Sequence, residues 1–316
     1  MTGRPIVVGC DGSVGSQAAL RWAVDEAAVR RSKLLLVHAS PTLQQFVRPF
    51  GAHRPREADA LREAGQSILD DATAVVAALS PDLHVEAQLA STTVNMALSC
   101  HSAAHEMVVV GSRGQPGFTD LPPGSGGVRL AGVACPVVLV QADEHPGGMA
   151  PRRRQRREQI VVGVDSLETS LEALSFAFEE ASLRGVGLTA LHAWQSPYFD
   201  GATGRIPQAY SLVADEFQAS ESRVLGERIQ SWTARLPSVA LVRRVVHADP
   251  ASALAHGSRE AALLVIGFGG DESASPVLGP VTRTIIGQAK CPVAIVRHSR
   301  RATTSDNSTI GAYVRS

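Results

Sequence analysis

The sequence of 316 residues predicts two α/β domains of the doubly wound type, one after the other. Three observations predict this fold class: near-continuous apolar runs, helical periodicity between those runs, and a repeat of the whole pattern in the second half. Apolar runs without alternation suit strands that are covered on both faces, which is typical of parallel sheets with helices on each side. We therefore expect two tandem open parallel sheets flanked by helices.

The repeat has the length of a domain. Residues 6–11 (IVVGCD) match residues 160–165 (IVVGVD) at an offset of 154 residues. Farther on, two more matches share an offset of 156 residues: Val109-Val110-Gly111 with Val265-Ile266-Gly267, and Ala134-Cys135-Pro136-Val137 with Lys290-Cys291-Pro292-Val293 except before the cysteine. A period of this size exceeds that of a solenoid unit, so it indicates duplication of a whole domain.

Each half shows the same order of expected elements. A buried apolar strand is followed by a helix, a second strand, a variable polar stretch, a helix and two more strands. The first helix presents one apolar face in each copy, made of Leu20, Val24 and Ala27 in the first and Leu171, Leu174 and Phe178 in the second. The other expected strands include residues 34–38, 107–110 and 137–140 in the first half and 188–192 and 293–296 in the second.

Composition sets the domain boundaries. Residues 144–158 contain Pro146-Gly147-Gly148 and the basic run 152–157, so we interpret them as a linker between domains 1–143 and 159–298. The basic run is a solvated connector in this interpretation, although such a run can also touch nucleic acid or an anionic surface. Residues 299–316, rich in Arg, Thr and Ser, are expected to form a loose tail.

Charge and hydropathy exclude several classes of function. The chain has 30 Lys and Arg residues against 30 Asp and Glu residues, so no global field gathers nucleic acid and DNA binding is not expected. No segment approaches the ~20 apolar residues that cross a bilayer, and the N-terminus shows no signal-peptide pattern. These features predict a soluble, cytoplasmic protein without a membrane partner.

Cysteine and histidine spacing does not favour a metal site. The four cysteines show no CxxC pattern, so neither a disulfide framework nor a zinc site is indicated. His101 and His105 would share a helix face near Cys100 and Glu106, but the HExxH pattern and a spaced third ligand are missing. The four cysteines are Cys10, Cys100, Cys135 and Cys291.

Two equivalent histidines, His38 and His192, end the second strand of each half. No serine or cysteine in a nucleophile-elbow context accompanies either of them. We expect them to pack or to form hydrogen bonds, and we expect no catalytic residues.

Two signals point to a ligand site where strands of the first half end, the usual place for ligands in an open parallel sheet. Asp11 directly follows the first strand, and its carboxylate could accept hydrogen bonds from a ribose hydroxyl or an adenine amine. A glycine loop, Gly111-x2-Gly114-x9-Gly124-Ser125, follows a later strand. Glycine allows close approach to bare backbone N–H groups, which form an anion site together with a helix N-terminus. The alternative is a tight surface turn.

The familiar nucleotide signatures are missing. The sequence contains no GxxxxGK[ST] loop, and its first strand is not followed by a GxGxxG turn. A kinase or a dinucleotide-dependent enzyme is therefore not supported.

Several segments together resemble the universal stress protein family. They are IVVGCDGS followed by SQAALRWAVDEAAVR, the pair GSRG and GS with nine residues between them, and ACPVVLV. The resemblance covers both halves. It implies a Rossmann-like fold of five parallel strands in each half, pairing of the two domains, further homodimers in some members, and a role in stress response or growth regulation.

The resemblance also implies ATP as the ligand, with or without Mg. Asp11 would lie near the ribose and adenine, the backbone around Ala39 would meet the base, and the glycine loop would hold the phosphates. The residues implied in the first domain are Gly9, Asp11, Ala39, Gly111, Ser112, Arg113, Gly114, Gly124 and Ser125. Their counterparts in the second domain are Gly163, Asp165, Gly267, Gly270 and Gly279.

Both loops depart from the family pattern. In the first, Gly127 replaces a common second hydroxyl, and the spacing from Gly124 to Cys135 is one residue short. In the second, eight residues separate Gly270 from Gly279, and Pro280 stands where a serine is usual, so one N–H and one hydroxyl are lost. Each hydrogen bond to a charged group is worth roughly 1.5 to 3 kcal/mol, so we expect the first domain to bind ATP better.

Three functions remain open on this basis. The leading one is an ATP-binding regulatory protein that is not an enzyme. The second is a nucleotide-independent interaction module with an unidentified protein partner, and the third is a slow ATP hydrolase. The loop has no lysine, although Arg113 and Asp120 could contribute to hydrolysis. The last strands of the two halves could pair within one chain, which leaves a homodimer optional.

Overall fold

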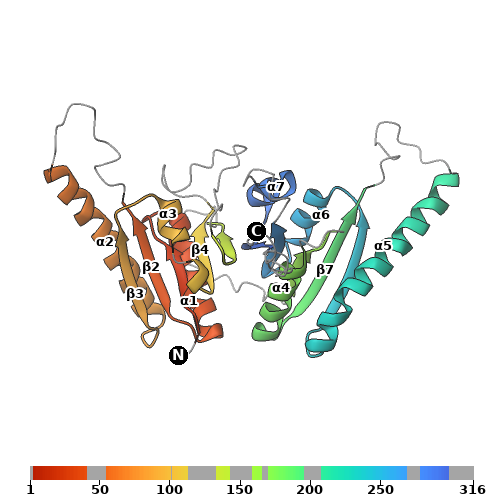
Figure 1. The fold of residues 1–316 in the computed structure, drawn as a ribbon, viewed down its shortest axis with the longest axis horizontal. Coiled ribbons are helices and arrows are strands. Elements are labelled where there is room, and N and C mark those ends of the chain that lie inside the picture. Colours follow the sequence, from red (N-terminus) through yellow and green to blue (C-terminus); the bar gives the residue numbers. More distant parts are fainter. Residues whose placement is uncertain are drawn as a thin grey trace, which may run out of the picture.

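A computed structural model of the chain describes residues 3–40, 55–100, 102–112, 133–142, 159–165, 170–195, 208–268 and 278–298. Figure 1 shows two halves side by side, each a sheet flanked by helices. The expected linker 144–158 and tail 299–316 lie outside the described residues.

The described residues of the first half form five strands. The strands are β1 (Ile6–Gly9), β2 (Leu34–Ala39), β3 (Val85–Ala90), β4 (Met107–Gly111) and β5 (Val137–Val140). The helices are α1 (Val14–Arg30), α2 (Pro55–Leu79), α3 (Val94–Ser99) and the short 3-10 helix η2 (Ser102–Ala104).

The second half repeats this order. The strands are β6 (Gln159–Gly163), β7 (Gly187–Trp194), β8 (Leu241–His247), β9 (Leu263–Phe268) and β10 (Val293–Arg297). The helices are α4 (Leu171–Arg184), α5 (Gln208–Arg235), α6 (Pro250–Gly257) and α7 (Pro280–Gln288). No helix among the described residues is long and apolar enough to cross a bilayer.

The two halves share one sheet. Its strand order is β3-β2-β1-β4-β5-β10-β9-β6-β7-β8, and all neighbours are parallel except the central pair. In that pair β5 and β10 run antiparallel, with Ala294 opposite Val138. The parallel α/β class is therefore confirmed for each half, and the two five-stranded sheets are continuous because their last strands pair.

The sequence of α1 determines where this helix begins, where it ends and which face it buries. Ser13 caps its N-terminus by accepting a hydrogen bond from the Ser16 backbone N–H, and Arg31 in the left-handed conformation ends it. The expected face of Leu20, Val24 and Ala27 is buried. The cap at Ser13 therefore starts α1 shortly after β1 ends, and the apolar face of α1 packs against the sheet.

The expected face of α4 is only partly right. Leu174 and Phe178 are fully buried, but Leu171 is 41% exposed. Leu171 is the first residue of the helix, and a helical side chain leans toward the preceding turn, which α4 lacks.

Two hydrophobic layers cover the sheet. The core on one face includes side chains of α1, α2, α4 and α5, and the core on the other face includes side chains of α3, α6 and α7. Each core contains residues of both halves, so the halves form one packed body. α2 and α5 lie at its outer ends, and α1 and α4 lie toward its centre (Figure 1).

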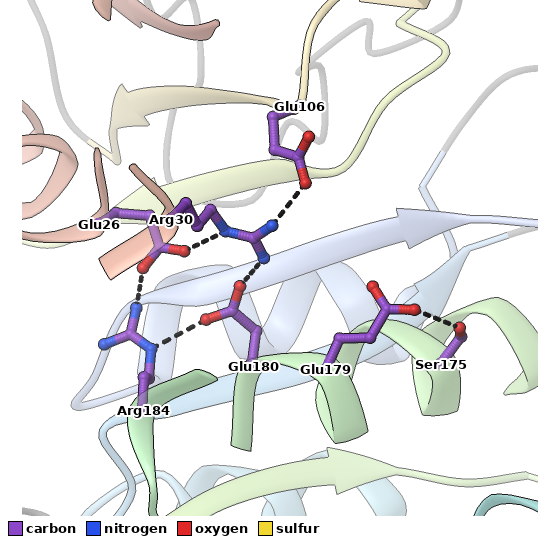
Figure 2. Close-up of polar contacts among 7 residues, drawn as sticks. All are labelled: Glu26, Arg30, Glu106, Ser175, Glu179, Glu180 and Arg184. Atoms are coloured by element: carbon purple, nitrogen blue, oxygen red, sulfur yellow. Dashed lines mark hydrogen bonds and ion pairs between the residues drawn. The ribbon is translucent and has the colours of Figure 1, made fainter. Parts of the chain in front are cut away.

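A ring of charged side chains joins α1 to α4 at this centre (Figure 2). The guanidinium of Arg30 contacts Glu26 and Glu180, and that of Arg184 contacts the same two carboxylates from the other side. Both glutamates are fully buried. Burial alone would raise the pKa of Glu180, but the charges of Arg30 and Arg184 lower it.

The ring follows the internal repeat. Glu26 and Arg30 occupy the positions in α1 that Glu180 and Arg184 occupy in α4. Each arginine also lies over an aromatic ring of the other half, because Arg30 stacks on Phe176 and Arg184 stacks on Trp22. The sequence reasoning missed this ring. Its signal was a glutamate and an arginine four residues apart at the same place in both copies of the helix.

Candidate functional site

The segment after β1 forms a tight turn at the carboxyl end of the sheet. Asp11 is 4% exposed, and its Oδ1 accepts a hydrogen bond of 2.9 Å from the Ser13 backbone N–H. Gly12 has φ of +79°, a conformation that favours glycine. The turn therefore holds the Asp11 carboxylate beside the first turn of α1.

The end of β4 touches the same turn. A Cβ on Gly111 would lie 2.5 Å from the Gly15 carbonyl carbon and 2.9 Å from the Ser16 backbone nitrogen. Only glycine permits this approach between a strand end and a helix start. The structure thus brings together Asp11, the N-terminus of α1 and the start of the glycine loop, which the sequence separates by 100 residues.

Ser112 continues the pairing of β4 with β5. Its backbone N–H donates to the Val140 carbonyl at 2.8 Å, so the sheet engages that donor and the Ser112 hydroxyl is the group left for a ligand. Gln141 follows β5 directly, and its side-chain amide is buried with no hydrogen-bond partner among the described residues. A buried amide without a partner is costly, which makes Gln141 a candidate contact for a polar ligand. The sequence reasoning missed Gln141, since only its position after a strand marks it.

The base side of the expected site is formed by the ends of β2 and β3. Ala39 is buried and pairs in register with Ala90, and the Ser40 backbone N–H donates to the Ala90 carbonyl at 2.9 Å. Gly9 ends β1 and pairs with Val37 of β2. These strand ends border the Asp11 turn.

The two strand-end histidines form hydrogen bonds, as expected. His38 Nδ1 lies 2.7 Å from the Cys10 carbonyl, and His192 Nδ1 lies 2.7 Å from the Val164 carbonyl. Each histidine thus ties its strand to the segment after the neighbouring strand. In the second half, His192 Nε2 also lies 3.2 Å from the Glu221 carboxylate.

The corresponding turn of the second half differs. Asp165 is exposed, and its Oδ1 accepts a hydrogen bond of 2.8 Å from the Ser170 hydroxyl. Gly163 ends β6 and faces Leu254, while Gly267 lies within β9. Gly279 precedes Pro280 at the start of α7, has φ of −60°, and has open space where a Cβ would lie. Nothing in its conformation requires glycine.

Several expected site residues lie outside the described residues: Arg113, Gly114, Gly124, Ser125 and Gly270. Asp120, Gly127 and His101 lie outside them as well. Within the described ranges, no group of three or more His, Cys, Asp or Glu side chains is placed to hold a metal ion, and Glu106 pairs with Arg30 at 2.5 Å.

Comparison with known proteins gives the family. The model of the Universal stress protein family matches residues 3–141 and 156–297. The chain belongs to the universal stress protein family. It is a tandem member, because the match occurs once in each half.

Relatives of this universal stress protein have the same tandem length. It is 34% identical to a universal stress protein of Mycobacterium tuberculosis over 307 residues, covering 93% of this chain and 96% of the relative. It is 32% identical to one of Mycolicibacterium smegmatis over 298 residues, covering 92% and 96%. Among solved structures, a universal stress protein of Archaeoglobus fulgidus shares the fold with a TM-score of 0.61 at 14% identity, covering 94% of this chain and 97% of that chain.

Proposed function

We propose that this universal stress protein binds ATP in its first half and acts as a regulatory protein in stress response or growth control. The observation that carries the proposal is the meeting of the buried Asp11 turn, the α1 N-terminus and Gly111 at the carboxyl edge of the sheet. A carboxylate for a ribose thereby lies next to the start of a glycine loop suited to phosphates.

The described residues fit a nucleotide in the first half better than in the second. Asp11 is buried at the edge and is held in its turn by the Ser13 N–H, whereas Asp165 is exposed and accepts a hydrogen bond from the Ser170 hydroxyl. The unpartnered amide of Gln141 lies at the end of β5, next to the strand from which the glycine loop departs. In the second half, Pro280 opens α7 and supplies no N–H.

We propose binding without turnover. A bound nucleotide would fix the glycine loop and so shift the population of conformations that contact a protein partner or a second copy. Magnesium, if it accompanies ATP, would supply charge neutralisation of the phosphates. The role of the chain's own residues is to orient the ribose through Asp11 and to hold the phosphates through loop backbone groups.

The test is isothermal titration calorimetry with ATP on the purified full chain, after a denatured sample has been checked for co-purified nucleotide. We expect a stoichiometry near one. Asp11→Ala removes a hydrogen bond to a charged group and should weaken binding by about tenfold or more. Gly114→Ala should also weaken it, because glycine allows a ligand to approach the backbone closely.

The matched control is Asp165→Ala, the same change at the equivalent place in the second half, which should leave ATP affinity unchanged. Incubation with ATP should release no phosphate over hours. Absence of both binding and co-purified nucleotide would exclude the proposal and favour the nucleotide-independent interaction module.

A further inference from the structure

The second half contains a basic hollow that the nucleotide proposal does not use. The hollow has a volume of about 460 Å³ and lies between the C-terminal ends of α6 and α7. Arg259 precedes β9 and Lys290 precedes β10, so the hollow lies at the amino ends of these strands. Asp165 follows β6, which is parallel to β9, so it lies at the opposite edge of the second half's strands.

Two cationic side chains, Arg259 and Lys290, line this basic hollow. His256 adds an imidazole, and Ser252 and Gln288 add a hydroxyl and an amide. All five residues are exposed to solvent, and no carboxylate belongs to the lining among the described residues. The hollow therefore offers positive charge and neutral hydrogen-bond donors to a ligand from solution.

The first half provides an internal control, because it has the same hydrogen bond between the segments before its last two strands but lacks the charged side chains. The Lys290 backbone N–H donates to the Ser258 hydroxyl at 2.9 Å, and the Ala134 backbone N–H donates to the Ser102 hydroxyl at 2.9 Å. At the places of His256, Arg259 and Lys290, the first half has Cys100, Ala103 and Ala134. The fold therefore does not need cationic side chains in the segments before β9 and β10.

Helix termination does not account for the basic side chains at the end of α6 either. Basic side chains are common near helix C-termini because they complement the free carbonyls there. At the end of α6 these carbonyls already have local partners. Leu254 accepts from the Ser258 N–H, Ala255 from the Ser258 hydroxyl, and His256 from the Arg259 N–H.

We propose that the basic hollow binds a small phosphate-bearing anion. A guanidinium can bind a phosphate through two parallel hydrogen bonds, and a lysine ammonium adds a compact positive charge. The volume is that of a small-molecule site. A concave site of this size suits a diphosphate better than the flat contact of a protein partner.

The test uses inorganic pyrophosphate as the probe and equilibrium dialysis on the full chain at low salt. The variant is Arg259→Ala with Lys290→Ala, which installs the residues of the first half. We expect its affinity to fall by about tenfold or more, and we expect added salt to weaken wild-type binding. Because both side chains are exposed, its thermal unfolding should match the wild type.

The control is Arg283→Ala, an exposed arginine of α7 that does not line the hollow, and it should bind pyrophosphate normally. Gly114→Ala separates this site from the glycine loop of the first half. Loss of pyrophosphate binding in Gly114→Ala with no change in the double variant would overturn the proposal. So would binding of an acidic peptide together with no binding of pyrophosphate. Neither outcome decides whether ATP binds at Asp11.

Discussion

At the scale of single residues, burial separates the cysteines into two classes. Cys10, Cys135 and Cys291 are buried, and Cys100 is exposed. Burial and then the charge of Asp11 raise the pKa of Cys10 to about 12, and burial raises that of Cys135 to about 11. A thiol reacts as its thiolate, so a raised pKa makes a cysteine inert at neutral pH.

We therefore expect only Cys100 to react with iodoacetamide at pH 8 in the native protein. Mass spectrometry should find one added group per chain, and four after denaturation in guanidinium. Cys100→Ser is the control, and it should remain unmodified while native. Rapid native modification of Cys10 would show that the turn after β1 opens readily.

At the scale of elements, the packing of α1 on β4 depends on one missing side chain. The Cβ position of Gly111 lies 2.5 Å from backbone of the first turn of α1, closer than any real Cβ contact. Because backbone cannot rotate away as a side chain can, an added methyl must displace the helix start. That start also carries the Asp11 turn.

Gly111→Ala should lower the free energy of unfolding by about 1 to 3 kcal/mol, the usual cost of overpacking, and should also weaken ATP binding. Urea denaturation measures the first effect. Gly287→Ala is the matched control: it lies in α7 with open space at its Cβ position, and alanine is a better helix former than glycine. Equal stability of the two variants would contradict the packing argument.

The sequence predicts the elements that are buried and repeated. Residues 6–9 and 160–163 read as strands because they are continuously apolar, and the helix after each has a clear apolar face. The sequence does not locate β3, because Glu86, Ala87 and Gln88 are exposed and this edge strand has no apolar run.

The candidate site is predictable in part. Asp11 and Gly111 are visible as residues that follow strands, and their meeting follows from the parallel order of β1 and β4. The contact of Gly111 with Gly15 is not predictable, since it depends on the angle at which α1 lies on the sheet. No sequence motif marks Gln141 or the basic hollow. The one sign of the hollow is that Lys290 in the second copy replaces Ala134 of the first within an otherwise matching segment.

At the scale of the whole molecule, the charged ring holds α1 against α4. Removing one member of a buried ion pair usually costs more than the pair contributes, because the remaining charge stays buried. Glu180 compensates both arginines, and its side chain is fully buried. A change there tests the pairing of the two halves.

Glu180→Gln should destabilise the protein by about 1.5 to 3 kcal/mol, the worth of a hydrogen bond to a charged group, since Arg30 and Arg184 each lose one carboxylate partner and keep Glu26. The midpoint of urea unfolding, followed by tryptophan fluorescence, measures the effect. Glu227→Gln breaks the exposed pair with Arg223 and should change stability by less than about 1 kcal/mol. A similarly small effect for Glu180→Gln would mean that the ring does not stabilise the pairing.

The continuous sheet has a consequence for how the two copies can differ. In a dimer of identical chains, every substitution occurs twice, once on each side of the two-fold axis. Here the two sides of the β5–β10 junction belong to one chain, so each residue changes alone. One side can therefore keep Asp11 buried in the turn before α1 while the other carries Pro280, Arg259 and Lys290. Because the two domains are joined in one chain, each can acquire its own residues while the pairing of the domains is kept.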